Sequence, residues 1–272
     1  MPGSAPPAGR QSVDDVALWY HTLELPGGVV TPGWFDLRGV VRRLPWPEVR
    51  GKRCLDVGTY DGFYAFELER RGAREVVATD IARHEDWDLP APGRSQAEAA
   101  LRQLAGEKGL GFEVAREVLG SRVEKRILSV YDLSPDRVGT FDVVVCGNLM
   151  LHLRDPVRAL EAIRSVCTGR FMSIEEVSLG LSIALRKRAV AELRLDPRLG
   201  QWWVPNAAGH ARVVAVAGFE VIEQMGPFSE PFGAGHPPRG RGAGPLALRL
   251  ARQLLAGGDG VPHAALLARP VI

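Results

Sequence analysis

The chain has 272 residues, 46% of them hydrophobic, and its 34 Lys and Arg residues against 32 Asp and Glu residues give a formal net charge of +2. This length and apolar content support one large core, and the near-neutral charge excludes a global basic field that would attract nucleic acid or a membrane surface. The three cysteines lie apart and show no metal-ligand spacing, so we predict reduced thiols in a cytoplasmic protein and no metal site.

The first fifty residues are predicted to cap the fold. Residues 1–11 contain several prolines and no apolar signal core, so we expect a disordered leader, and no apolar run is long enough to cross a bilayer. Residues 12–50 are expected to form cap helices, the first of which is amphipathic and runs from Val13 to His21. Its aromatic residues Trp19 and Tyr20 are candidate substrate contacts, with simple packing on the sheet as the alternative.

The most informative segment is a strand followed by a glycine turn and a helix. The apolar strand from Arg53 to Val57 runs into Gly58 and Gly62, and a helix follows from Phe63. Such a turn lets a ligand approach main-chain atoms. The next strand, Glu75 to Asp80, ends in a carboxylate that suits the two hydroxyls of a ribose, because it can accept from both. We therefore predict a nucleoside site, with an ordinary tight turn as the alternative.

The turn lacks the patterns that hold phosphate groups. Neither G-x-G-x-x-G nor G-x-x-x-x-G-K-[ST] is present. Instead, Asp56 and Asp61 stand where a dinucleotide site would present bare amides to a pyrophosphate. Acids at this place suit a ligand with an ammonium and a sulfonium group, which points to S-adenosylmethionine as the cofactor.

The segments that follow alternate strands with helices. An insertion of about residues 85–120 precedes a third strand from Val123 to Val130. The fourth strand, Phe141 to Cys146, is apolar throughout, which is typical of a strand buried on both faces. Asp155 and Pro156 then open a helix as its N-cap and first residue, and Arg170 to Glu176 forms a fifth strand. This alternation predicts an α/β fold with a doubly wound, seven-stranded, mostly parallel sheet.

The last third of the chain is predicted to add a second insertion and to complete a domain that spans residues 51–272. Both insertions are expected to act as lids over the site. In chain order we expect an insertion at about 178–210 with a basic helix from Leu181 to Leu195, a sixth strand from Gly218 to Glu223, a long connection at 226–260 with a helix from Leu246 to Leu255, and an antiparallel last strand from Ala264 to Val271.

The ordered motifs resemble a known family. Leu55-Asp56-Val57-Gly58, Asp80, Tyr131-Asp132-Leu133 and Phe141-Asp142-Val143-Val144 resemble the class I S-adenosylmethionine-dependent methyltransferases, which have a Rossmann-like fold. Thr59-Tyr60-Asp61-Gly62-Phe63 and Leu151-His152 resemble the branch of the tRNA wobble-uridine carboxymethyltransferases and their relatives. The resemblance implies that Asp80 holds the ribose, that Asp132 meets the adenine amino group and Leu133 covers the adenine ring, and that Gly147 and Asn148 lie beside the methionine end. The full implied cofactor set is Asp56, Gly58, Thr59, Asp61, Gly62, Asp80, Ile81, Tyr131, Asp132, Leu133, Gly147 and Asn148.

Methyl transfer requires alignment of the reacting groups in a dry pocket, and a neutral hydroxyl must also lose its proton to a base. His152, just after the fourth strand, is the first candidate for this base, and His21 is the second. The alternative for His152 is that it only orients a loop. Glu175 and Glu176, at the end of the fifth strand, are further candidates for the base. Glu175, Trp202 and Trp203 join Trp19 and Tyr20 as candidate substrate contacts.

Three functions compete for this chain. The near-neutral charge and the aromatic flanks favour methyl transfer to an oxygen, less readily a nitrogen, of a small molecule such as a secondary metabolite in natural product biosynthesis. Leu151 stands before His152, at the place where the wobble-uridine enzymes that the chain resembles have a tyrosine. In those enzymes the tyrosine resembles part of a site that binds the carboxylate of a carboxylated cofactor, so its loss favours ordinary methyl transfer. A tRNA wobble-uridine-modifying methyltransferase is the second hypothesis, and a cofactor-binding protein without turnover is the third.

Overall fold

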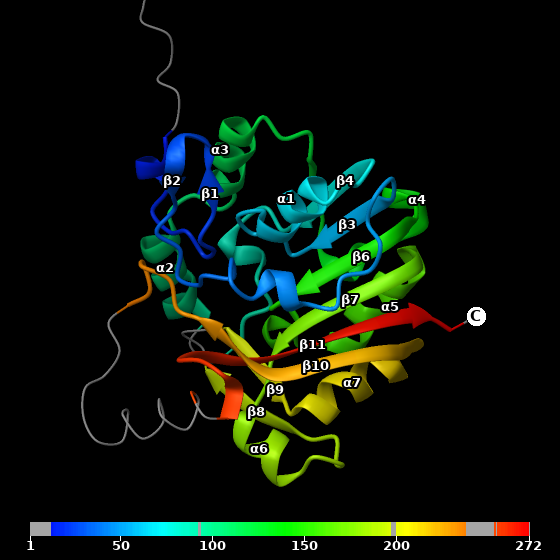
Figure 1. Cartoon of the computed structure of the whole chain (residues 1–272). Helices are drawn as coiled ribbons and strands as arrows, with labels where there is room; N and C mark the ends of the chain where they lie inside the picture. The colour runs from blue at the N-terminus through cyan, green and yellow to red at the C-terminus, as the bar shows by residue number, and fades with distance from the viewer. Residues whose placement is uncertain (1–11, 92–93, 197–199, 238–252, 254, 272) are drawn as a thin grey trace, which may run out of the picture.

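A computed structural model describes residues 12–91, 94–196, 200–237, 253 and 255–271, and its centre is a seven-stranded sheet (Figure 1). The strand order is β10-β11-β7-β6-β3-β4-β5. Within this sheet β11 runs antiparallel to β7 and β10, and the remaining neighbours pair in parallel. The predicted α/β fold is therefore confirmed. In chain order the strands are β3 (Arg53–Val57), β4 (Glu75–Asp80), β5 (Glu124–Ile127), β6 (Phe141–Gly147), β7 (Cys167–Glu176), β10 (Phe219–Pro231) and β11 (Gly260–Pro270).

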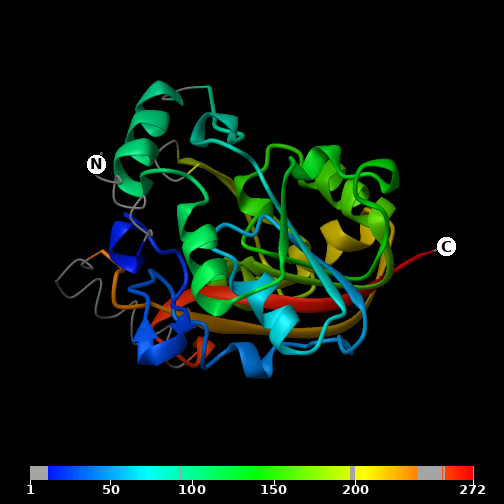
Figure 2. The same ribbon diagram turned by 90° about the horizontal axis from the view of Figure 1, so that it is seen from above.

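Helices cover both faces of the sheet (Figures 1 and 2). One face packs against α1 (Phe63–Arg70), α3 (Leu110–Leu119) and the N-terminal segment, and the other packs against α4 (Pro135–Val138), α5 (Pro156–Val166) and α7 (Ala207–Val216). Consecutive residues of a strand join opposite cores: Cys54 belongs to the first and Leu55 to the second. Because both faces are covered, the central strands are continuous apolar runs.

The N-terminal segment corrects the prediction of cap helices. Only Val13–Asp15 of the predicted helix forms a helical turn, a 3-10 turn labelled η1. The chain from Val16 to Tyr20 is not helical, and His21 forms an isolated β-bridge with Phe35. The carbonyls of Trp19 and Tyr20 accept hydrogen bonds from the amides of Trp34 and Phe35, both at 2.9 Å. These long-range backbone bonds replace the helical ones, so tertiary pairing overrides the amphipathic pattern. The short strands β1 (Glu24–Leu25) and β2 (Val29–Val30) and the 3-10 turns η2 (Pro26–Gly28) and η3 (Val41–Arg43) complete this segment.

The two insertions differ in structure. The first contains the turn η4 (His84–Asp86) and helix α2 (Arg94–Ala105), followed by α3. The second contains α6 (Leu179–Ala184) and the hairpin of β8 (Ala191–Asp196) and β9 (Gln201–Pro205), so the basic helix predicted from Leu181 to Leu195 is wrong beyond Ala184. Arg194 pairs with Glu176 at 2.8 Å, and this contact joins the hairpin to the end of β7.

The connection predicted at 226–260 is shorter than expected, because β10 continues to Pro231. A register shift between Met225 and Phe228 absorbs the glycine and proline that suggested a loop, and Phe228–Pro231 then pair with β11 again. The helix predicted from Leu246 to Leu255 falls almost wholly outside the described residues. In the part of the chain that the structure describes, no helix is long and apolar enough to span a membrane.

Candidate active site

A cavity of about 770 Å³ opens at the carboxyl ends of the parallel strands. Residues that follow β3, β4, β6 and β7 line it together with the N-terminal segment and β11, and most of the lining is apolar. Ligands of doubly wound α/β folds bind at this edge of the sheet. Four of the six histidines of the chain lie in the lining: His21, His152, His236 and His263.

The glycine turn after β3 forms one wall of the cavity. Gly58 has a φ of 76° and lines the cavity, where a side chain would meet Leu149. Gly62 has a φ of 92°, does not line the cavity, and leaves room for the ring of Phe66 at the start of α1. Tyr60 also lines the cavity, and its backbone has a positive φ of 49°. The residues of the turn that face the cavity are therefore Gly58 and Tyr60.

The acids of this turn lie below the cavity surface. Asp56 is buried, accepts a hydrogen bond of 2.6 Å from the hydroxyl of Thr59, and does not line the cavity. Burial raises the pKa of Asp56 to about 7. Asp61 is also buried and bound to His21. The predicted cofactor contacts of Asp56, Thr59, Asp61 and Gly62 are therefore corrected to a role in shaping the turn.

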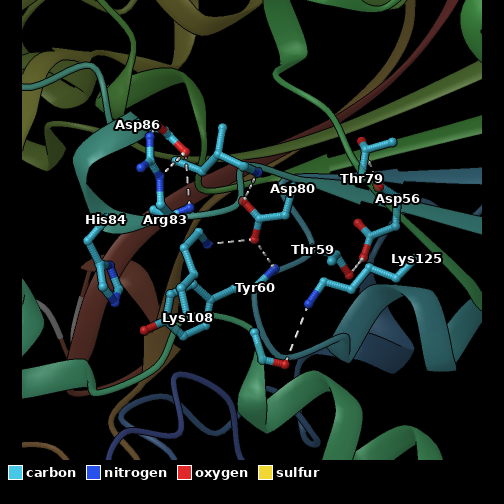
Figure 3. A network of polar contacts seen from close by, with 12 residues as sticks. Asp56, Thr59, Tyr60, Thr79, Asp80, Arg83, His84, Asp86, Lys108 and Lys125 are labelled. Carbon is cyan, nitrogen blue, oxygen red and sulfur yellow. Dashed lines mark hydrogen bonds and ion pairs between the residues drawn. The ribbon is translucent and has the colours of Figure 1, made fainter.

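The predicted ribose acid does face the cavity. The carboxylate of Asp80 accepts from the amides of Tyr60 at 3.0 Å and Ile81 at 2.8 Å, and from the ammonium of Lys108 at 2.8 Å (Figure 3). Asp80, Ile81 and Lys108 all line the cavity. Sequence reasoning missed Lys108, because it stands in the insertion and belongs to no motif.

The slot predicted for adenine is built from the end of β5 and the turn η5 (Val130–Asp132). Leu128, Ser129, Val130 and Tyr131 line it. The hydroxyl of Tyr131 donates to Asp88 at 2.9 Å, and burial raises its pKa to about 12. The predicted adenine contacts of Asp132 and Leu133 are wrong in this geometry: the Asp132 side chain is 52% exposed and lies 3.6 Å from Arg137, and Leu133 is in the core.

A buried polar cluster lies at the end predicted for methionine. Gly147 and Asn148 line the cavity after β6, as the predicted contact requires. Asn148 donates to Glu230 at 2.9 Å, and Nε2 of His263 lies 2.7 Å from Asn148 Oδ1 and 3.1 Å from Glu230. Nδ1 of His263 faces the carbonyl of Val261 at 2.8 Å. Both ring nitrogens of His263 therefore face oxygen atoms, and the ring connects β11 to Asn148 and Glu230. Sequence reasoning missed both residues, since they stand on the last two strands.

His21 and Asp61 form a second buried pair. Nδ1 of His21 lies 2.5 Å from Asp61 Oδ1, and the amide of His21 donates to Asp61 Oδ2 at 2.7 Å. Burial alone would lower the pKa of His21, but the charge and hydrogen bond of Asp61 outweigh it and raise the pKa above 6.5. The ring also stacks on Phe63 at 5.1 Å, next to the glycine turn.

His152 and Glu175 have different surroundings. His152 lines the cavity from the turn η6 (Met150–His152), and its Nδ1 lies 3.1 Å from the carbonyl of Gly200. Glu175 does not line the cavity: its buried carboxylate accepts from the amides of Leu149 and Met150, and burial raises its pKa to about 8. The predicted substrate contact of Glu175 is therefore wrong in this geometry, whereas Glu176, the other candidate base at the end of this strand, lines the cavity.

Of the predicted aromatic contacts, Tyr20 lines the cavity and three tryptophans do not. Trp19 is 1% exposed and donates from its indole to the carbonyl of Val13. Trp202 donates to the carbonyl of Asp88 at 2.5 Å, and Trp203 donates to that of Arg154 and borders a separate groove. The predicted substrate contacts of Trp19, Trp202 and Trp203 are therefore corrected to packing roles.

The residues of the cavity fit S-adenosylmethionine. The ligand-facing part of the turn carries no side chain at Gly58, Asp80 keeps acceptor capacity, and the slot beside Val130 is apolar. Glu176 and Asn148 add polar side chains to the lining. This donor set matches a ligand that combines a ribose, a purine and cationic groups.

Comparisons with known proteins agree with this fit. The chain is 29% identical over 121 residues to the tRNA U34 carboxymethyltransferase of Campylobacter hominis, which covers 44% of this chain and 34% of that protein. It is 30% identical over 115 residues to the ubiquinone biosynthesis O-methyltransferase of Neisseria meningitidis serogroup C, which covers 42% of this chain and 39% of that protein. The matches thus span less than half of either relative.

A solved structure shares the fold. The S-adenosylmethionine dependent methyltransferase from Mesorhizobium loti superposes with a TM-score of 0.50 at 16% identity, over 86% of this chain and 97% of that one. Residues 36–224 match the family model described as a methyltransferase domain. The chain belongs to this methyltransferase family.

Proposed function

We propose that this enzyme transfers a methyl group to an oxygen of a small, mainly apolar acceptor that carries a hydroxyl group. The observation that carries the proposal is the part of the cavity beyond the predicted cofactor contacts, which combines an apolar wall with the His21–Asp61 pair. The wall consists of Leu18, Trp34, Leu151, Leu153, Val177, Leu179, Ile183 and Val261.

The charges of the lining support a neutral acceptor. Among the described residues, one lysine and one arginine line the cavity. Lys108 is paired with Asp80, and Arg194 is paired with Glu176. A phosphate-rich acceptor would require cations that are available to it. An apolar metabolite instead gains from burial against aliphatic and aromatic side chains.

In the proposed reaction the cofactor, when bound, supplies a methyl group on a sulfonium. Gly58, Asp80, Tyr131 and Asn148 are the residues proposed to hold it. His21 is proposed as the general base for the acceptor: Asp61 holds Nδ1, which leaves Nε2 to take the hydroxyl proton, and the carboxylate stabilises the imidazolium that forms. His152, the first candidate from sequence, remains a second proposal because it also lines the cavity.

A panel of acceptors tests the proposal. Release of S-adenosylhomocysteine is measured with phenols and apolar alcohols, with amines of similar shape, and with unmodified tRNA. We expect turnover with hydroxyl acceptors, and an exchange of His21 to Ala should lower kcat by about 10²–10⁴-fold with little change in cofactor affinity. Turnover with the amines alone would refute oxygen transfer, and full activity of the exchanged enzyme would remove His21 as the base.

A tRNA acceptor is the second candidate, and the similarity to the Campylobacter hominis enzyme favours it. Binding to tRNA through phosphates should weaken steeply as salt is raised from 50 to 200 mM. Salt-dependent retention on tRNA together with methylation of it would replace our proposal. The role in secondary metabolism and the cytoplasmic location are also proposals, the latter supported by three buried, free cysteines.

A further inference from the structure

Lys108 lies at the ribose end of the cavity in an unusual environment for a lysine. It stands between α2 and α3, where Gly106 and Gly109 adopt positive φ values of 60° and 88°. Its side chain is only 4% exposed, and its ammonium lies 2.8 Å from Asp80 and 4.9 Å from the centre of the Tyr60 ring (Figure 3). A buried ammonium is costly unless it is paired, so these contacts hold the turn between α2 and α3 against the end of β4.

Asp80 has little acceptor capacity left for a ribose. A carboxylate oxygen accepts about two hydrogen bonds. Oδ2 already accepts from the amide of Tyr60 and from Lys108, and Oδ1 accepts from the amide of Ile81. One position therefore remains, on Oδ1, whereas the ribose presents two hydroxyl groups. In this arrangement Asp80 alone does not bind both hydroxyls.

Lys108 has the complementary capacity. An ammonium carries three N–H donors. One donates to Asp80 and the face of the Tyr60 ring satisfies a second, while the described residues supply no further acceptor. Because Lys108 lines the cavity, the remaining donor can reach a ligand there. A hydroxyl accepts as well as donates, so it can bind to an ammonium as readily as to a carboxylate.

We propose that Lys108 binds the cofactor directly and donates to one ribose hydroxyl while Asp80 accepts from the other. The pair then recognises the diol without breaking its own ion pair. Since Lys108 comes from the first insertion, binding of the ribose also stabilises the position of that insertion. The inference depends on the cofactor and is independent of the proposed acceptor.

Calorimetry with S-adenosylhomocysteine tests this role in the full chain. We expect Lys108→Met to weaken binding by about 10- to 100-fold, the value of one hydrogen bond to a charged group. Lys125→Met is the matched control: Lys125 is also largely buried, stands 4.9 Å from the Phe112 ring and does not line the cavity. Its exchange should leave the affinity within about 3-fold of the original.

The 2′-deoxy and 3′-deoxy analogues of the same ligand complete the test. Both analogues should bind the unmodified protein more weakly than S-adenosylhomocysteine does. In Lys108→Met one of the two should bind as tightly as S-adenosylhomocysteine, because the hydroxyl group that it lacks is the one to which Lys108 donated. Unchanged binding of S-adenosylhomocysteine by Lys108→Met would overturn the proposal. Tighter binding would also overturn it, and would show that Lys108 competes with the ribose for Asp80. Thermal unfolding checks that the variants fold, and Lys108→Gln replaces Lys108→Met if the latter does not.

Discussion

Exchange of Asp61 to Asn provides the sharpest test of the His21–Asp61 pair. Asp61 accepts from the amide of His21 with one oxygen and contacts Nδ1 with the other. An asparagine that keeps the first bond turns its NH₂ group toward Nδ1. The proton of the neutral ring then moves to Nε2, the nitrogen proposed to act as base. The shape of the site is preserved while its base loses its lone pair.

The expected loss follows from the contribution of a positioned base, about 10²–10⁴-fold in kcat. In the unmodified enzyme kcat/KM should rise with pH as His21 loses its proton, with a midpoint above 6.5 because its pKa is raised. In Asp61→Asn this midpoint should move to lower pH, since the charge that raised the pKa is gone. The plateau above it should also be lower.

Turnover is measured by release of S-adenosylhomocysteine between pH 5 and 9, and calorimetry with the same compound controls for cofactor binding. Stability gives an independent measurement. Because folding raises the pKa of His21, the stability from this pair is complete at pH values below 6.5 and is lost as the pH rises through the folded pKa. An Asp61→Asn enzyme with the original pH profile and full turnover would refute the proposed base.

Two further predictions concern stability, both measured by chemical denaturation. Gly62→Ala should destabilise the protein by about 2–4 kcal/mol, because a Cβ would overlap the ring of Phe66. Gly120 also has a positive φ but has open space around it, so Gly120→Ala should cost only about 1–2 kcal/mol. Equal losses in the two variants would contradict the steric argument. Glu230→Gln should cost about 1–3 kcal/mol, because the buried carboxylate accepts from the Asn148 amide and lies 3.1 Å from Nε2 of His263, and a side-chain amide does not replace both contacts. An unchanged free energy of unfolding would contradict a structural role of this cluster.

Local patterns predicted the parts of the site that are built from adjacent residues. The strand from Arg53, the turn at Gly58 and the strand that ends at Asp80 are each specified by a few neighbouring side chains and by glycine conformations. The family order then placed Asn148 after β6 correctly. These features depend on interactions between neighbouring residues and on the order of the strands, and both can be predicted from a sequence.

The remaining features depend on long-range contacts. Trp19 and Tyr20 are not helical because their carbonyls accept from the amides of residues 34 and 35, and an amphipathic pattern contains no information about that partner. Lys108 and His263 reach the cavity from an insertion and from the last strand, and Glu230 lies buried beside His263 on the neighbouring strand. No motif marks them, and their chemistry becomes evident only when the fold brings them to Asp80 and Asn148.

The acids that first suggested a cationic cofactor act differently from the way the sequence implied. Burial raises the pKa of Asp56 to about 7, so this carboxyl group carries only part of a charge near neutral pH, and it is directed to Thr59 within the turn. Asp61 is committed to His21. The acids that line the cavity are instead Asp80, Asp86, Asp88 and Glu176. The turn therefore contributes its backbone shape, and the acids that a ligand in the cavity can contact come from the end of β4, from the segment that follows it and from the end of β7.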